Sequence, residues 1–165
     1  MENTSPPRRI RPPLWGSPMA RMLHVYWRFA RGMTLGVRGL VADRSGRVLL
    51  VQHSYIRGWH LPGGGVEPGE TTLQSLGREL AEEANVHLTD RPRLHGIFFN
   101  NRASGRDHVA VYVVRDFEQS GPFQPTREIT HAAFFAVDAM PGDTTAGTRA
   151  RIAEVLGGAH IADHW

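Results

Sequence analysis

The chain has 165 residues, of which 41% are hydrophobic and 21% are charged, as is typical of one soluble globular domain. Its 19 basic residues are all arginine, are scattered, and give a formal net charge of +3, so we expect no nucleic acid polymer as a partner. Cysteine is absent, which excludes disulfides, thiolate metal sites and cysteine nucleophiles. Without an apolar run that suits a signal peptide or a membrane span, we expect a cytoplasmic protein with no stable membrane association.

Two segments precede the predicted domain. Residues 1–18 hold five prolines and little periodic pattern, which indicates a disordered or loosely attached arm rich in Pro and Arg. Residues 19–33 form an N-terminal amphipathic segment, with apolar side chains at helical spacing. We expect this segment to pack on the domain or on a second copy in a homodimer, and an interfacial membrane helix is the less favoured alternative.

The rest of the chain alternates strand-like and helix-like patterns. Residues 34–43 and 47–54 are rich in Val and Leu and predict a hairpin around a turn at 44–46. Residues 94–101 and 108–117 predict two further strands joined by a turn at 104–105, and residues 129–137 predict another. Residues 144–158 predict a C-terminal helix, followed by a tail at 159–165. This order predicts one α/β domain over 34–158, with helices packed on a mixed sheet.

Residues 63–86 carry the most informative pattern, a glycine turn followed by a helix. Thr71 and Gln74 fit a capping box, which predicts that the helix begins after the turn at 67–70. At about 100° per residue, one face collects the apolar positions and is expected to be buried: Leu73, Leu76, Gly77, Leu80 and Ala84. Three acids, Glu79, Glu82 and Glu83, lie along a flank beside this face.

The acidic flank does not stabilise the helix. Like charges four residues apart cost about a few tenths of a kcal/mol on an exposed helix, and acids near a helix C-terminus oppose the helix dipole. We therefore expect a cation among these carboxylates, and oxygen ligands without cysteine favour Mg²⁺ or Mn²⁺ over zinc. From these residues alone, a solvated acidic face without a ligand is the alternative.

The spacing of these residues resembles a known family. The sequence matches eight of the nine defined positions of the Nudix box, at Gly64, Glu70, Arg78-Glu79-Leu80, Glu82-Glu83 and Val86. The lead-in at residues 59–64 is similar to that of the family, and the resemblance extends over roughly residues 34–140. One position departs, because Asn85 stands where the family has glycine. We expect Asn85 to end the helix in a left-handed conformation, which asparagine tolerates next best after glycine.

The resemblance implies a Nudix-type alpha/beta/alpha sandwich with a mixed β-sheet, and a hydrolase that uses Mg²⁺ or Mn²⁺ to cleave a diphosphate linked to another group. By position, Glu79, Glu82 and Glu83 resemble the metal ligands of the family, with Gly64 also counted at the metal site. Glu79 or a loop acid would be the general base, and Arg78 would orient the catalytic Glu. Glu70 would be a supporting acid. Glu128, ahead of the last strand, is a further candidate for metal binding or for the base, and an ordinary strand-end acid is its alternative.

The sequence says less about the substrate, which we expect to be a small molecule that contains a diphosphate. A nucleoside triphosphate and a nucleotide sugar both stay open. Six residues near the box or on predicted strands and loops are candidates for substrate contacts: Arg57, Trp59, His60, Gly63, Phe99 and Tyr112. For the aromatic residues on strands, packing in the core is the favoured alternative, and for His60 it is a surface or packing role. The alternative function is a catalytically silent Nudix-like nucleotide sensor or binding module. An isopentenyl diphosphate isomerase fits less well, because that enzyme uses a cysteine.

Overall fold

The structure is a computed structural model of the chain and describes residues 22–23, 25–27, 30 and 32–165. It divides into two compact units, Met1–Gly32 and Met33–Trp165. The predicted arm at 1–18 lies outside the described residues. In the first unit, residues 22–23, 25–27 and 30 are helical. No helix in the described ranges is long and apolar enough to cross a membrane.

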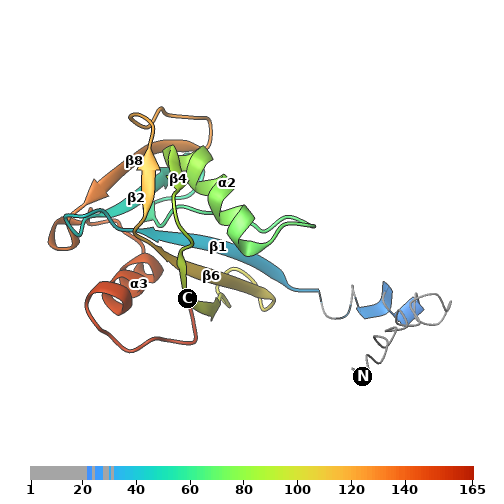
Figure 1. The fold of residues 1–165 in the computed structure, drawn as a ribbon. Coiled ribbons are helices and arrows are strands. Elements are labelled where there is room, and N and C mark those ends of the chain that lie inside the picture. Colours follow the sequence, from blue (N-terminus) through green and yellow to red (C-terminus); the bar gives the residue numbers. More distant parts are fainter. Residues whose placement is uncertain (1–21, 24, 28–29, 31) are drawn as a thin grey trace, which may run out of the picture. The chain divides into compact units, whose positions relative to one another are not determined.

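The second unit follows the predicted alternation of strands and helices (Figure 1). Its strands are β1 (Thr34–Val41), β2 (Val48–His53), β3 (Trp59–His60), β4 (Val86–Leu88), β5 (Arg93–Phe99), β6 (Asp107–Val114), β7 (Phe117–Gln119) and β8 (Ile129–Phe135). Its helices are α2 (Thr72–Ala84), the short 3-10 helix η1 (Val137–Ala139) and α3 (Ala146–Leu156).

The strands form three small sheets, in the orders β1-β6-β5, β3-β2-β8 and β4-β7. The predicted hairpin of β5 and β6 is confirmed by their antiparallel pairing. The predicted hairpin of residues 34–43 and 47–54 is wrong beyond its turn, because β1 pairs in parallel with β6 while β2 pairs with β3 and β8. The reason is that the second edge of β1 is taken by the glycine loop. Val37 N–H donates to Gly64 at 2.8 Å, and Gly39 N–H donates to Pro62 at 2.8 Å.

Helices α2 and α3 lie on opposite sides of the strands, which gives the predicted sandwich (Figure 1). Side chains alternate along β1, so that Val37 and Val41 face Leu76 and Leu80 of α2 in one core. The intervening Leu40 packs in a second core with residues of α3: Ile152, Val155 and Leu156. Because both faces of β1 are covered, this strand lies at the centre of the domain.

Helix α2 begins and ends as its sequence predicts. Thr71 accepts a hydrogen bond from the backbone of Gln74, and the Gln74 side chain accepts one from the backbone of Thr71, so the capping box is present. Asn85 adopts φ 55° and ψ 37°, the left-handed conformation expected of it. Its N–H bonds to the carbonyl of Ala81, and its side chain contacts Ser120 and Gly121. The helix therefore keeps its normal ending despite the departure from glycine.

Residues 159–165, expected to be a tail after the domain, run along the end of β5. Phe99 N–H donates to Asp163, and Trp165 N–H donates back to Phe99 at 3.1 Å. The Trp165 ring packs edge-on against Phe98. Below it, the buried Arg151 guanidinium lies 3.8 Å over the Phe98 ring and bonds to the carbonyl of His164. The C-terminal residues are thus packed and hydrogen-bonded against β5 and α3.

Candidate active site

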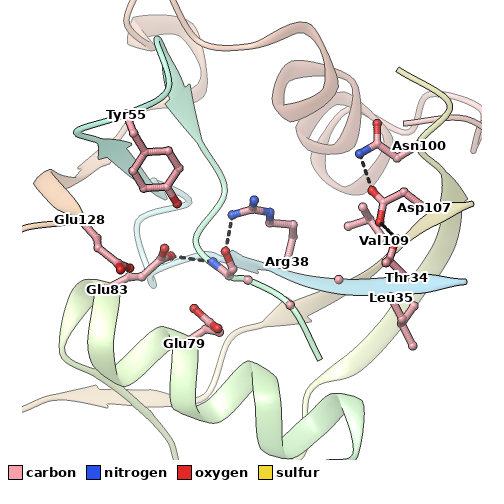
Figure 2. Close-up of a pocket in the computed structure, with 14 residues that line it drawn as sticks. Thr34, Leu35, Arg38, Tyr55, Glu79, Glu83, Asn100, Asp107, Val109 and Glu128 are labelled. Carbon is pink, nitrogen blue, oxygen red and sulfur yellow. Dashed lines mark hydrogen bonds between the residues drawn. The ribbon is translucent and has the colours of Figure 1, made fainter. Parts of the chain in front are cut away.

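A cleft of about 450 Å³ opens where β1, the glycine loop and α2 meet (Figure 2). The 54–58 loop and the start of β6 complete its wall. Its lining carries four carboxylates and a single cation: Glu79, Glu83, Asp107, Glu128 and Arg38. The other lining residues are Thr34, Leu35, Gly36, Tyr55, Gly63, Gly64, Gly65, Asn100 and Val109. This excess of negative charge is the main electrostatic property of the cleft.

Glu83 is the most buried of these acids, with 8% of its surface exposed. Its Oε2 accepts a hydrogen bond of 2.7 Å from the N–H of Gly63. Burial raises the pKa of Glu83 to about 7, while the Gly63 hydrogen bond and the charge of Arg38 oppose that rise. Nearby donors and cations therefore neutralise the negative charge of Glu83 only in part. A buried carboxylate with such a charge is a candidate ligand for a metal cation.

Two glycines let the backbone come close to the acids. At Gly64, a Cβ atom would lie 2.4 Å from Oε1 of Glu79, so a larger residue would displace that carboxylate. Gly63 has φ 138°, and a Cβ atom there would lie 2.1 Å from the carbonyl oxygen of Val37. Gly63 is therefore required for the loop to lie against β1, and Gly64 leaves the Glu79 carboxylate in place.

Glu128 reaches the same cleft from the residue before β8, and Figure 2 shows its carboxylate directed toward that of Glu83. The turn that places it is anchored to the end of β2, because Ser54 N–H donates to the Glu128 carbonyl at 2.8 Å. Glu82 differs, since its side chain is 62% exposed. It lines a neighbouring cavity of about 350 Å³ together with Glu79, Glu83 and Glu128.

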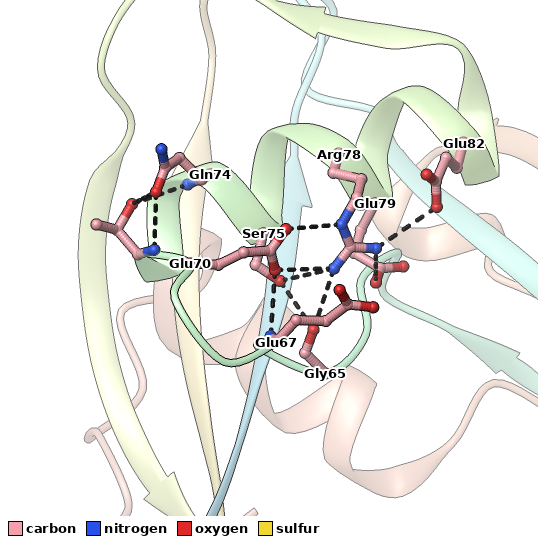
Figure 3. A network of polar contacts seen from close by, with 9 residues as sticks. Gly65, Glu67, Glu70, Gln74, Ser75, Arg78, Glu79 and Glu82 are labelled. Carbon is pink, nitrogen blue, oxygen red and sulfur yellow. Dashed lines mark hydrogen bonds and ion pairs between the residues drawn. The ribbon is translucent and has the colours of Figure 1, made fainter.

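Arg78 lies behind the acids and holds one of them (Figure 3). Its guanidinium contacts Glu79 at 2.7 Å, Glu70 at 3.0 Å and Glu82 at 3.5 Å. The Arg78 hydrogen bond is the largest effect that lowers the pKa of Glu70. This network fixes Glu79 at the cleft, so Arg78 has the geometry of a positioning residue.

Sequence reasoning missed Arg38. Its Nη1 donates to the carbonyl oxygen of Leu61 at 3.1 Å and to that of Gly63, which ties the glycine loop to β1. Burial lowers the pKa of Arg38, and the charges of Glu83 and Glu79 oppose this. The available signal was a lone arginine inside the apolar run of residues 35–42.

His53 and Tyr55 were also not predicted as substrate or metal residues. Tyr55 lines the cleft and is 66% exposed. His53 is buried, its Nδ1 lies 3.8 Å from Oε1 of Glu83, and neither ring nitrogen has a hydrogen-bond partner. Burial lowers the pKa of His53 to about 4, so its ring is neutral at pH 7 and the contact with Glu83 is not an ion pair. Both residues lie a short way before the box in sequence, and no pattern around them indicates their places in the folded chain.

Of the six residues predicted to contact substrate, only Gly63 lines the cleft. Trp59 packs edge-on against Phe135 at 4.9 Å between ring centroids, within the core under α3. The Tyr112 hydroxyl lies 2.6 Å from that of Thr72, under α2. The other three lie elsewhere: His60 bonds to the carbonyl of the exposed Arg57, and Phe99 packs near His108 and His164. The aromatic side chains predicted for stacking thus make contacts within the domain, and their role toward substrate stays a prediction.

The cleft offers carboxylate oxygens, which are the type of ligand that a hard divalent cation prefers. Glu79, Glu83 and Glu128 are carboxylates without sulfur or an available imidazole among them, which matches Mg²⁺ or Mn²⁺. Gly64, predicted at the metal site, lines the same cleft and already accepts a hydrogen bond from Val37. In the part of the chain that the structure describes, no three acidic or histidine side chains are close enough together to hold one ion. Gathering three of these carboxylates around one ion would require side-chain rotation.

Comparison with known proteins identifies the class to which this fold and cleft belong. The family model described as NUDIX domain matches residues 32–155, most of the chain. The chain therefore belongs to the Nudix hydrolase family, as the spacing of the box predicted.

Individual relatives agree with this assignment. An RNA pyrophosphohydrolase of Rhodopseudomonas palustris is 40% identical over 76 residues, covering 44% of each chain. The chain spans less than half the length of this and other curated RNA pyrophosphohydrolases that it matches. Among solved structures, a MutT Nudix hydrolase of Burkholderia pseudomallei has a TM-score of 0.63 and 26% identity, covering 74% of this chain and 97% of that one. An ADP-ribose pyrophosphatase of Streptococcus suis has a TM-score of 0.58 and 26% identity, covering 80% and 95%.

Proposed function

We propose that this protein is a metal-dependent hydrolase that cleaves the pyrophosphate bond of a nucleoside diphosphate linked to another group. The observation that supports this most is the buried, undercompensated Glu83 beside Glu79 and Glu128 in one cleft. The relatives named above are a pyrophosphohydrolase of RNA and a pyrophosphatase of ADP-ribose. Both names refer to cleavage of a diphosphate, which agrees with the chemistry of these acids.

The proposed roles follow from the position of each residue. Glu79, Glu82 and Glu83 would hold Mg²⁺ or Mn²⁺, which when bound neutralises the charge of a diphosphate and acidifies an attacking water. Glu128 faces the same space, so the proton of that water would pass either to Glu128 or to an acid of α2. Arg78 holds Glu79, and the glycine loop leaves room for a phosphate beside the carboxylates.

The substrate class stays as the sequence predicted it, a small molecule such as a nucleoside triphosphate, a nucleotide sugar or a related compound. A cytoplasmic location and a homodimer remain predictions. So does an alternative function, a catalytically silent Nudix-like nucleotide sensor or binding module.

A hydrolysis screen over nucleoside triphosphates, nucleotide sugars and dinucleoside polyphosphates, with Mg²⁺ and with Mn²⁺ and with the nucleotide products resolved by chromatography, tests the proposal. We expect turnover of at least one class, and loss of about 10²-fold or more of it in Glu83→Gln with an unchanged circular dichroism spectrum. Glu118→Gln, an exposed acid on β7, is the matched control and should stay active. A fully active Glu83→Gln would contradict the metal assignment.

Two further measurements separate the alternatives. Glu128→Gln with unchanged turnover would leave the general base among the acids of α2. Nucleotide binding by calorimetry without turnover of any compound would favour the sensor, because binding and chemistry would then be uncoupled.

A further inference from the structure

The end of the cleft that lies away from Glu79 and Glu83 is lined by a different set of side chains. Figure 2 shows Asp107, Asn100 and Thr34 together at that end, with Arg38 between them and the acids of α2. The Thr34 hydroxyl donates to Oδ1 of Asp107 at 2.7 Å, and the Asn100 amide donates to Oδ2 at 2.7 Å. Each carboxylate oxygen therefore has one donor from the chain.

These three residues, which we name the Asp107 subsite, are fixed by the backbone. Thr34 and Asp107 are paired in the parallel register of β1 and β6. Asn100 N–H donates to the carbonyl of Asp107 at 2.9 Å, across the hairpin. Backbone hydrogen bonds already pair the two strands of this hairpin, so its formation does not require the Asp107 carboxylate.

The Asp107 carboxylate has capacity for more donors. An ionised carboxylate offers about four lone-pair positions, and the chain supplies two hydrogen bonds. Because Asp107 lines the cleft, a ligand there can supply the others. A carboxylate accepts from hydroxyl, amino and ring N–H groups, and it repels a phosphate.

We infer that the Asp107 subsite binds a neutral, hydrogen-bond-donating part of the substrate, such as a sugar or a nucleobase, and disfavours a further phosphate. This rests on the proposed function, since it concerns a group attached to the diphosphate that the acids of α2 act upon. It narrows the substrate to a diphosphate with an O–H- or N–H-bearing group on the Asp107 side.

The test compares two substrates that share a diphosphate, with Mg²⁺ present. One is a nucleotide sugar, and the other is P1,P2-dimethyl diphosphate, which has no O–H or N–H donor. Asp107→Asn removes the charge at nearly constant shape. We expect it to lower kcat/KM for the nucleotide sugar about ten- to a hundredfold, the loss typical of a hydrogen bond to a charged group, and to leave dimethyl diphosphate unaffected.

Two further variants make the comparison specific. Thr34→Val removes one donor that orients the carboxylate and should lower kcat/KM for the nucleotide sugar about two- to tenfold, which keeps the test intact if Asp107→Asn folds poorly. Asp116→Asn, an exposed acid between β6 and β7, is the matched control and should change neither substrate.

The outcomes separate this inference from the proposed function. Equal losses for both substrates, or no loss for either, would overturn the Asp107 subsite while leaving the hydrolase in place. If neither compound is hydrolysed, the proposed function fails only if the other substrate classes of the screen are also left intact. Calorimetry of the nucleotide sugar then decides the inference, because weaker binding by Asp107→Asn, again about ten- to a hundredfold, supports it and unchanged binding overturns it.

Discussion

Glu154 and Glu83 are both buried carboxylates, and they differ in how completely the chain pairs them. Glu154 accepts from Arg151 at 2.6 Å, from His95 at 2.9 Å and from the N–H of Ala162 at 3.1 Å. Burial works to raise the pKa of Glu154, but these hydrogen bonds and the charge of Arg151 outweigh it and lower the pKa. Glu83 has a single backbone donor, and burial dominates its pKa.

The contrast indicates what each cluster is for. A buried carboxylate that the chain satisfies holds structure together, and here it joins α3 to the C-terminal residues. One that the chain leaves with surplus charge requires either a proton or an external cation. The same residue type thus serves stability at α3 and, in the proposed function, cation binding at α2.

The largest expected effect on stability is at Glu154, whose charge is paired by Arg151. Arg151→Met leaves Glu154 buried without its cation, and we expect the free energy of unfolding to fall by about 3–5 kcal/mol. Urea denaturation measures it. The double variant Arg151→Met with Glu154→Gln should recover part of the loss, because the uncompensated charge is gone. A loss below about 1 kcal/mol would show that Glu154 behaves as a surface acid and would break the comparison.

Removing the charge of Glu83 should stabilise the protein, whereas Arg151→Met should destabilise it. Its folded-state pKa of about 7 lies above the ordinary 4.5, so the folded protein binds this proton more tightly than the unfolded chain. The associated stability is therefore full below pH 4.5 and is lost as pH rises through 7. In EDTA at pH 8, Glu83→Gln should be more stable than the unsubstituted protein, by an amount on the order of 3 kcal/mol.

Thermal melts from pH 4 to 8 compare the two proteins and isolate this residue from other titrating groups. The difference between them should vanish at the acid end. Glu118→Gln serves as the control and should follow the unsubstituted protein throughout. A Glu83→Gln variant that is less stable at pH 8 would show that the charge of Glu83 is already compensated.

The smallest effect is expected at the end of the same helix. Asn85→Ala places a residue with a Cβ and no polar side chain at φ 55°, and we expect a loss of about 1 kcal/mol in chemical denaturation. Asn85→Gly removes the strain but also the contacts with Ser120 and Gly121, so the two effects should nearly cancel. Equal losses in both variants would assign the role of Asn85 to its side chain alone.

The sequence predicted those structural features that are set by residues close together in the chain. The capping box, the span of α2, its left-handed end and the β5–β6 hairpin all depend on residues close in sequence. The partner of β1 does not, because residues 62–66 compete with β2 for its free edge. A hairpin pattern alone does not reveal that competition, which is why this hairpin was predicted wrongly.

The candidate site divides in the same way. The spacing of Glu79 and Glu83 on one helix brought both to the cleft, and Glu128 was found from its place ahead of a strand. Arg38 and Asp107 escaped notice because their roles depend on elements that meet only in the folded chain. Trp59 and Tyr112 were considered for substrate contact from residue type, with core packing as the favoured alternative, and both make packing or hydrogen-bond contacts within the domain.

Both ends of the cleft are built on one strand. Thr34 belongs to the Asp107 subsite, while Arg38 borders the acids of α2, and both lie on β1, which is hydrogen-bonded to β6 along one edge and to the glycine loop along the other. Four residues of extended chain span about 13 Å. Since β1 cannot stretch or shift without breaking both sets of bonds, the chain fixes the separation between the Asp107 subsite and the acids of α2.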